Sequence, residues 1–176
     1  MPLLKILSVL SLVALTTGCV SSAVEPQIRF GVEALVPPFE SRDDNGQLVG
    51  LNIELGNALC AELKSSCVWV DQDYATNIEA LEAKRFDVIM PMTATAARRE
   101  RIDFTENLYP LSSRLVARQG SALQPTAESL KGMRIGVLAG TSREAFAKAR
   151  WQVAGVTVRS FRFNDQLIAS LQAGEI

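Results

Sequence analysis

The 176-residue sequence contains no histidine, so it lacks both the commonest general base of enzymes and a frequent zinc ligand. A G-x-S-x-G nucleophile elbow and a P-loop are also missing, and residues 136–140 read G-x-x-x-G rather than the dinucleotide-binding fingerprint. Catalytic carboxylates stay an open alternative, because Asp and Glu are plentiful and no spacing singles out a pair. We therefore expect no enzyme, no metal and no cofactor.

A strong excess of charge of either sign is absent as well. The formal net charge is −1, and 48% apolar with 21% charged residues is the composition of a globular domain. This balance gives no electrostatic footprint for nucleic acid or for an anionic membrane surface.

A hydrophobic run long enough to span a bilayer is missing too. The apolar run after Lys5 is short and ends near residue 15, which is typical of a secretory signal peptide over residues 1–23. Cleavage after Ala23 fits the small residues Ser21 and Ala23. The alternative is a cut before Cys19, which would leave Cys19 as a lipoprotein anchor.

The few cysteines fit an exported chain. Cys60 and Cys67 lie seven residues apart, and nearby thiols pair readily in an oxidising compartment, so we predict a disulfide. Two buried free thiols are the alternative, and the spacing fits no zinc pattern.

Hydrophobic periodicity predicts alternating strands and helices. In the first half we expect a hairpin-like excursion at residues 40–49, helices at 51–63 and 95–101 and before residue 86, and strands at 28–32, 67–70, 86–90 and 102–104. In the second half we expect strands at 114–118, 134–138 and 156–160 and helices at 141–151 and 165–173.

Such alternation predicts an α/β fold with a mainly parallel sheet in each half. We place the seam near Pro110 to Ser112, giving one lobe over 24–110 and another over 111–176. The last helix stops at Gly174 with no strand after it, so we expect both lobes to be incomplete and the natural protein to be longer.

Two helix starts carry groups suited to an anion. Thr93 to Arg98 places hydroxyls and a guanidinium at a turn that enters a short helix, where they can grip a carboxylate; a solvated basic face is the alternative. Thr141 and Ser142 form a second helix start, for which plain capping by the Thr141–Glu144 capping box is the alternative. Tyr74 lies in a predicted loop, where aromatic rings often wall a pocket.

From about Ile28 to Ile176 the chain resembles the periplasmic amino-acid-binding proteins of ABC importers, which form bacterial solute-binding protein family 3, and within it the lysine/arginine/ornithine and histidine binders. The stretches that carry this resemblance are 50–55 with Cys60 and Cys67, 113–117, 124–132 and 136–142. The resemblance implies a two-lobed, type II periplasmic-binding fold that closes about a two-strand hinge near Pro110 to Ser112. It also implies a periplasmic location, an amino-acid ligand and a membrane permease as partner, and we expect a monomer.

Matched position by position, the resemblance assigns roles to the candidate residues. It implies that Arg98 forks onto the ligand α-carboxylate beside the hydroxyls of Thr93 and Ser142, with Thr141 adjoining. It further implies that Glu33 receives a distal cation and that Tyr74 stacks on the aliphatic stem of the ligand. Cys60 and Cys67 match a family disulfide.

Three departures from the family pattern stand out. Val36 replaces an aromatic residue that forms the opposite wall of the ligand sandwich, and Pro91-Met92 replaces a serine pair. The aspartate that receives the ligand α-ammonium in the family would lie beyond Ile176.

The sequence therefore predicts the solute-binding component of an ABC-type amino-acid importer, which binds a polar, basic L-amino acid by lobe closure. Two alternatives stay open. One is an exported dehydratase-like enzyme on the same fold, with Glu33 as its acid or base; the other is the ligand-sensing domain of a signalling receptor.

Overall fold

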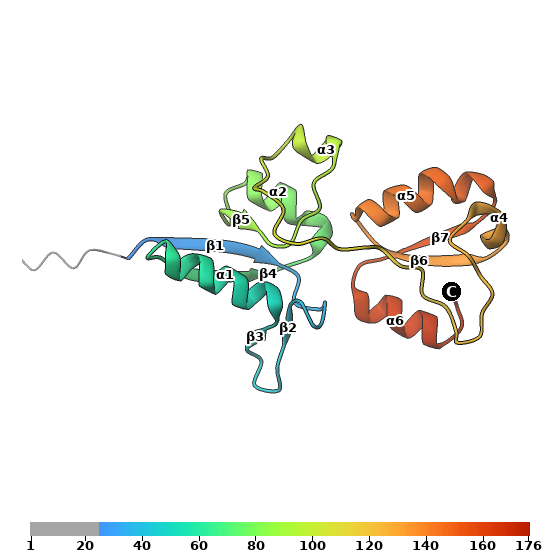
Figure 1. Cartoon of the computed structure of the whole chain (residues 1–176), viewed down its shortest axis with the longest axis horizontal. Helices are drawn as coiled ribbons and strands as arrows, with labels where there is room; N and C mark the ends of the chain where they lie inside the picture. Colours follow the sequence, from blue (N-terminus) through green and yellow to red (C-terminus); the bar gives the residue numbers. More distant parts are fainter. Residues whose placement is uncertain (1–24) are drawn as a thin grey trace, which may run out of the picture.

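The computed structural model describes residues 25–176, so the predicted signal peptide and both of its cleavage sites lie outside the described residues. The described chain forms two α/β halves joined by an irregular crossing segment (Figure 1). We call the half built on β1, β4 and β5 the first lobe and the half built on β6 and β7 the second lobe. No helix in this part of the chain is long and apolar enough to cross a membrane.

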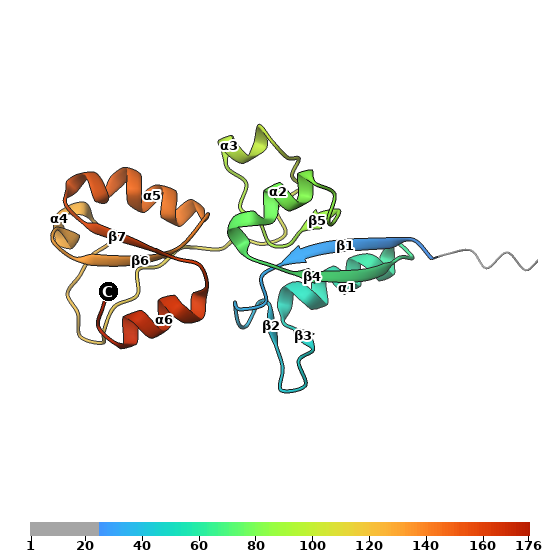
Figure 2. The ribbon, with the colours of Figure 1, turned by 180° about the vertical axis from the view of Figure 1, so that it is seen from behind.

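The sheet of the first lobe is parallel, in the order β4-β1-β5. Its strands are β1 (Gln27–Val32), β4 (Ser66–Asp71) and β5 (Val88–Ile89). Helices α1 (Leu51–Glu62) and α2 (Asn77–Glu82) lie on opposite sides of this sheet in both views (Figures 1 and 2). Burial on both sides explains why β1 continues as an apolar run toward its carboxyl end.

Shorter elements complete the first lobe. The predicted hairpin-like excursion is an antiparallel pair of two-residue strands, β2 (Ser41–Arg42) and β3 (Leu48–Val49). The 3₁₀ turn η1 (Tyr74–Thr76) precedes α2, and α3 (Ala96–Arg99) follows β5.

The second lobe contains the parallel pair β6 (Arg134–Leu138) and β7 (Thr157–Phe161). Helices α5 (Ser142–Arg150) and α6 (Asn164–Gln172) lie on opposite sides of this pair (Figures 1 and 2). The short α4 (Ala127–Leu130) precedes β6, and the 3₁₀ turn η2 (Gln152–Ala154) precedes β7. The predicted α/β class with mainly parallel sheets is therefore confirmed.

Two predicted strands are wrong, because residues 100–126 contain neither helix nor strand. At 102–104, the amide of Ile102 closes the last turn after α3 by donating to the carbonyl of Arg98 at 3.0 Å, so it is not available to a ladder. At 114–118, Val116 is 68% exposed and the segment pairs with no strand of the described chain. Alternating side chains predict a strand only where a neighbouring strand takes up the backbone hydrogen bonds.

Residues 100–126 form the irregular segment that crosses between the lobes, and a buried polar network holds its first part to the first lobe. The hydroxyl of Tyr109 donates to Asn52 Oδ1 at 2.7 Å, and the Asn52 amide donates to the buried carboxylate of Glu40. The rings of Phe39 and Tyr109 also stack, with centroids 6.2 Å apart. This network lies directly before the predicted seam at Pro110.

The predicted disulfide between Cys60 and Cys67 is present, with the two Cα atoms 5.8 Å apart. It joins the last turn of α1 to the start of β4 within the core of the first lobe, next to Phe30 and Met90. Phe30 also stacks on Trp69 at a centroid distance of 4.8 Å. The disulfide therefore fixes α1 against the sheet.

We expect the Cys60→Ala/Cys67→Ala double variant of the full-length protein to lose roughly 2–3 kcal/mol of unfolding free energy, because a closed loop of about eight residues no longer restricts the unfolded chain. Urea denaturation followed by circular dichroism measures this loss. A reductant should lower the midpoint of the wild type to that of the variant and leave the variant unchanged. Equal midpoints under oxidising conditions would contradict the expectation.

Candidate ligand-binding site

The candidate residues gather where the parallel strands end. β1 points toward the second lobe, and the loops after β6 and β7 contact the first lobe (Figure 1). Open α/β sheets bind ligands at the carboxyl ends of their strands. The residues at or after these ends are Glu33 after β1, Asp71 and Asp73 at β4, Thr93 and Arg98 after β5, Gly140 to Ser142 after β6, and Phe163 and Asp165 after β7.

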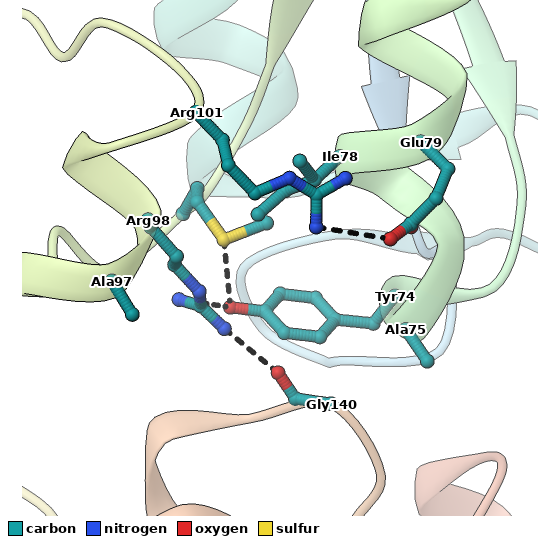
Figure 3. A pocket seen from close by; sticks show the side chains of 9 residues that line it. Tyr74, Ala75, Ile78, Glu79, Ala97, Arg98, Arg101 and Gly140 are labelled. Carbon is teal, nitrogen blue, oxygen red and sulfur yellow. Dashed lines mark hydrogen bonds and ion pairs between the residues drawn. The ribbon is translucent and has the colours of Figure 1, made fainter.

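The Arg98 guanidinium lies at the contact between the lobes (Figure 3). Its Nη1 donates to the carbonyl oxygen of Thr93 at 2.7 Å and to the hydroxyl of Tyr74 at 3.3 Å. Its Nη2 donates across the interface to the carbonyl oxygen of Gly140 at 2.8 Å. All three acceptors are neutral, and none of the ion pairs of the described chain includes Arg98. The guanidinium charge is thus available to a carboxylate.

A pocket of about 250 Å³ adjoins Arg98 and is shared by both lobes. Gly140 closes it from the second lobe with φ +73°, and a Cβ at this position would lie 2.7 Å from the Cα of Ala75. Only glycine therefore lets the loop after β6 approach the first lobe this closely. The lining residues, drawn in Figure 3, are Tyr74, Ala75, Ile78, Glu79, Met92, Ala97, Arg98, Arg101 and Gly140.

The hydroxyl residues at the start of α5 have different surroundings. Thr141 is buried, and its hydroxyl donates to the carbonyl of Leu138 at 2.7 Å and accepts the amide of Glu144 at 3.1 Å, which caps the helix as predicted. The second half of the capping box differs from the expectation, because the Glu144 carboxylate accepts the amide of Gly140 at 2.6 Å instead of that of Thr141. Ser142 is half-buried in the first turn of α5.

Glu33 is a buried carboxylate with one unpartnered oxygen. Its side chain directly follows β1 and is 4% exposed. Oε2 accepts the backbone amide of Tyr74 at 3.2 Å, whereas Oε1 has no hydrogen-bond partner. Burial raises the pKa of Glu33 to about 7, the Tyr74 amide opposes this rise, and nearby aspartates add to it. An unpartnered buried oxygen of this kind is costly unless a donor reaches it.

A second pocket, of about 600 Å³, opens beside Glu33 and is also lined by both lobes. It is rich in carboxylates, with Glu33, Asp71 and Asp73 from the first lobe and Asp165 from the second. Its apolar wall includes Leu35 and Pro37 from the first lobe, and Phe163 and Ile168 from the second. In the described chain, no group of three or more His, Cys, Asp or Glu residues could hold a metal ion. The carboxylates together with the apolar wall suit an organic cation with an apolar stem.

Two of the pocket carboxylates already have cationic partners. Asp71 accepts the backbone amide of Ala34 at 3.0 Å and pairs with Arg42 at 2.9 Å. Asp73 pairs with Arg162 across the interface: Nε of Arg162 donates a hydrogen bond to Oδ2 of Asp73, so a charge-assisted hydrogen bond joins the lobes here.

The departures from the family pattern can also be located. Val36 lines neither pocket, and its backbone forms an isolated β-bridge with Glu40. Met92, from the replaced serine pair, accepts the hydroxyl of Tyr74 at its sulfur at 3.3 Å and lines the pocket beside Arg98.

The fold brings Arg98, Thr93, Tyr74 and Gly140 together, and it joins Glu33 to the same cluster through Tyr74. We call the second pocket, beside Glu33, the acidic pocket. The sequence analysis missed four of the residues that line it: Asp71, Asp73, Phe163 and Asp165. Their signal is their position at or just after the carboxyl end of a strand. Many residues follow strand ends, so this position singles out the four residues only once the structure shows which strand ends of the two lobes face one another.

The family of bacterial extracellular solute-binding proteins, family 3, matches residues 28–174 of the chain. The lysine/arginine/ornithine-binding periplasmic protein of Escherichia coli (strain K12) is 39% identical over 174 residues, which cover 98% of this chain and 67% of that protein. The chain thus spans about two thirds of the length of this relative and of a histidine-binding periplasmic protein from the same strain.

Two solved structures extend this likeness to the fold. An ancestral arginine-binding protein bound to arginine gives a TM-score of 0.82 at 31% identity, over 86% of this chain and 68% of the other. An ancestral amino acid-binding protein described as a precursor of cyclohexadienyl dehydratase gives a TM-score of 0.76 at 28% identity, over 85% of this chain and 65% of the other. These similarities confirm the expected two-lobed fold of periplasmic amino-acid-binding proteins.

The raised pKa of Glu33 predicts a pH-dependent cost of folding. Because the pKa is about 7 in the folded protein against an ordinary value of 4.5, the folded state holds the proton more tightly, and stability falls as pH rises from about 4.5 to about 7. Glu33→Gln removes the charge but can still accept the Tyr74 amide. We expect it to raise the melting temperature of the ligand-free protein above pH 7 and to change it little near pH 4.

Thermal melts across this pH range measure the difference between variant and wild type. Glu62→Gln, at the exposed end of α1, is the matched control and should follow the wild type. The buried Glu40, whose pKa burial also raises to about 7, keeps some pH dependence in every variant. A Glu33→Gln curve parallel to the wild type at all pH values would refute the expectation.

Proposed function

The chain belongs to the bacterial extracellular solute-binding proteins, family 3, and on that premise we propose that it is the solute receptor of an ABC-type importer, which binds a basic L-amino acid between its lobes. We propose further that it acts in the periplasm as a monomer, that its partner is a membrane permease, and that it binds no nucleic acid. The relatives named above are themselves binding proteins, which supports a receptor rather than an enzyme.

One juxtaposition carries this proposal: Tyr74 contacts both an uncompensated cation and an uncompensated anion. Its hydroxyl accepts a hydrogen bond from the Arg98 guanidinium, and its backbone amide donates one to the Glu33 carboxylate. An amino acid with a cationic side chain has the complementary charges, a carboxylate at one end and a cation at the other. We therefore assign the α-carboxylate to Arg98 and the distal cation to Glu33, with the ring of Tyr74 along the stem.

The remaining roles follow from this orientation. Thr93 holds the Arg98 guanidinium through its carbonyl, and its hydroxyl is proposed to reach the carboxylate together with Ser142. Thr141 supports this position by capping α5. The lobes divide near Pro110 to Ser112, so residues 24–110 and 111–176 contribute opposite walls.

Lobe closure gives this arrangement its transport role. Arg98 and Glu33 belong to the first lobe, whereas Gly140, Ser142 and Asp165 belong to the second. A ligand held by both lobes favours the closed state by its differential affinity for that state. The permease can then recognise the loaded receptor by its shape.

A dehydratase-like enzyme is the second candidate, and the pKa of Glu33 near 7 favours it, because a general acid or base works best near the operating pH. One similar structure, itself an amino acid-binding protein, is described as a precursor of cyclohexadienyl dehydratase, which makes a dehydratase the enzyme to test. Incubation of the full-length protein with a cyclohexadienyl substrate tests it: aromatic product that forms with the wild type and not with Glu33→Gln would favour the enzyme, and no product would favour the receptor.

We expect basic L-amino acids to raise the melting temperature of the full-length wild type, because a ligand that binds only the folded state stabilises it by mass action. Arg98→Ala should weaken arginine binding by roughly 100-fold or more, since it leaves the α-carboxylate without its charged partner. A thermal-shift screen of the common L-amino acids, followed by titration calorimetry with arginine, measures both effects.

Arg99→Ala is the matched control, because Arg99 neighbours Arg98 on α3 and lies over the ring of Phe104 instead of lining a pocket. It should bind arginine as the wild type does. No thermal shift with any basic amino acid, or equal losses in the two variants, would count against the proposed function.

A further inference from the structure

We propose that Asp165 of the second lobe is a specificity-determining residue that pairs with the distal cation of the ligand opposite Glu33, and so selects a guanidinium over a neutral group of the same shape. This inference rests on the proposed function and adds to it a residue that the sequence analysis did not identify.

The first step is the distribution of charge in the acidic pocket. Of its four carboxylates, Asp71 is neutralised by Arg42 and Asp73 by Arg162. Glu33 and Asp165 take part in none of the ion pairs of the described residues. The pocket therefore has an unmatched carboxylate on each lobe.

The second step is the unpartnered oxygen of Glu33. Glu33 is 4% exposed, lines the pocket and has no hydrogen-bond donor to its Oε1. Burying a carboxylate oxygen without a donor is unfavourable, so the site is incomplete as it stands. A donor that enters the pocket would complete it.

The third step is that Asp165 acts on the same space. It begins α6 directly after β7, lines the pocket, and its charge contributes to the raised pKa of Glu33. Two carboxylates that repel each other across a cavity are both relieved by one cation placed between them. The same cation would then join the lobes.

A guanidinium fits this position better than a compact ammonium. It presents five N–H donors in a plane, so it can bond carboxylates on two sides at once, and its face stacks on aromatic rings. Phe163, which also lines the pocket, supplies such a ring; the Arg162 guanidinium lies over it 4.9 Å from its centroid, so the proposed ligand would use the other face. This ring also offers an apolar wall from the second lobe, whereas Val36 of the first lobe lines neither pocket.

The test compares L-arginine with L-citrulline, which replaces the guanidinium by a neutral group of nearly the same shape. Titration calorimetry with the full-length protein at pH 8 gives the dissociation constant of arginine. Competition against arginine gives the dissociation constant of citrulline. We expect Asp165→Asn to weaken the binding of arginine about tenfold and to leave the binding of citrulline nearly unchanged, because only the charged ligand loses a partner.

Glu128→Gln is the matched control, because Glu128 also lies in the first turn of a second-lobe helix, is exposed and lines neither pocket. It should leave both constants unchanged. Asp165 Oδ1 accepts a hydrogen bond from the backbone amide of Gln166 at 2.7 Å. Asp165→Ser retains a side-chain acceptor for this amide and gives a second measurement if Asp165→Asn folds poorly.

The outcomes separate the two proposals. Arginine binding that is lost in Arg98→Ala but changes less than fivefold in both Asp165 variants would overturn the role of Asp165 and leave the proposed function standing. Equal weakening of arginine and citrulline would also overturn it, since that pattern indicates a general disturbance of the site. A wild type that binds no amino acid would overturn the proposed function itself.

Discussion

The arrangement of this protein depends on one constraint: a carboxylate held out of water at the carboxyl end of a central strand. β1 lies between β4 and β5, so the residue that follows it enters the gap between the lobes. Glu33 occupies that position with one oxygen bonded to a backbone amide and the other unpartnered. A fold dedicated only to stability would place an apolar residue there, because an unpaired buried charge costs free energy. The cost is understandable if a ligand supplies the missing donor.

The same topology places the opposite charge within reach. Arg98 follows β5, and its guanidinium is held by neutral oxygens of both lobes, including the carbonyl of Gly140. Tyr74 lies between the cation and the anion and contacts both. Because the strands of each sheet are parallel, all these groups emerge at the same edge. The candidate site and the contact between the lobes therefore share residues, and under the proposed function ligand binding is coupled to lobe contact.

Sequence patterns predicted the elements whose partners lie nearby in the chain. The helix over 51–63, the β6–α5 unit with Thr141 as its cap, and the Cys60–Cys67 disulfide were all foreseen, since each depends on local periodicity or spacing. The strand predicted at 114–118 failed because a strand needs a neighbour that periodicity does not reveal. Arg98 was singled out by its place at a helix start and matched to a carboxylate-binding arginine by family resemblance, whereas Glu33 was identified through the resemblance. Asp165 was missed because the role proposed for it depends on the residues of the opposite lobe that line the same pocket.

The most direct measurement is a crystal structure of the full-length protein grown with L-arginine. The account predicts one arginine between the lobes, with its α-carboxylate on the Arg98 guanidinium, its stem along Tyr74 and its guanidinium bonded to Glu33 Oε1. Arginine bound in the reverse orientation, or bound away from Glu33 and Arg98, would contradict the account.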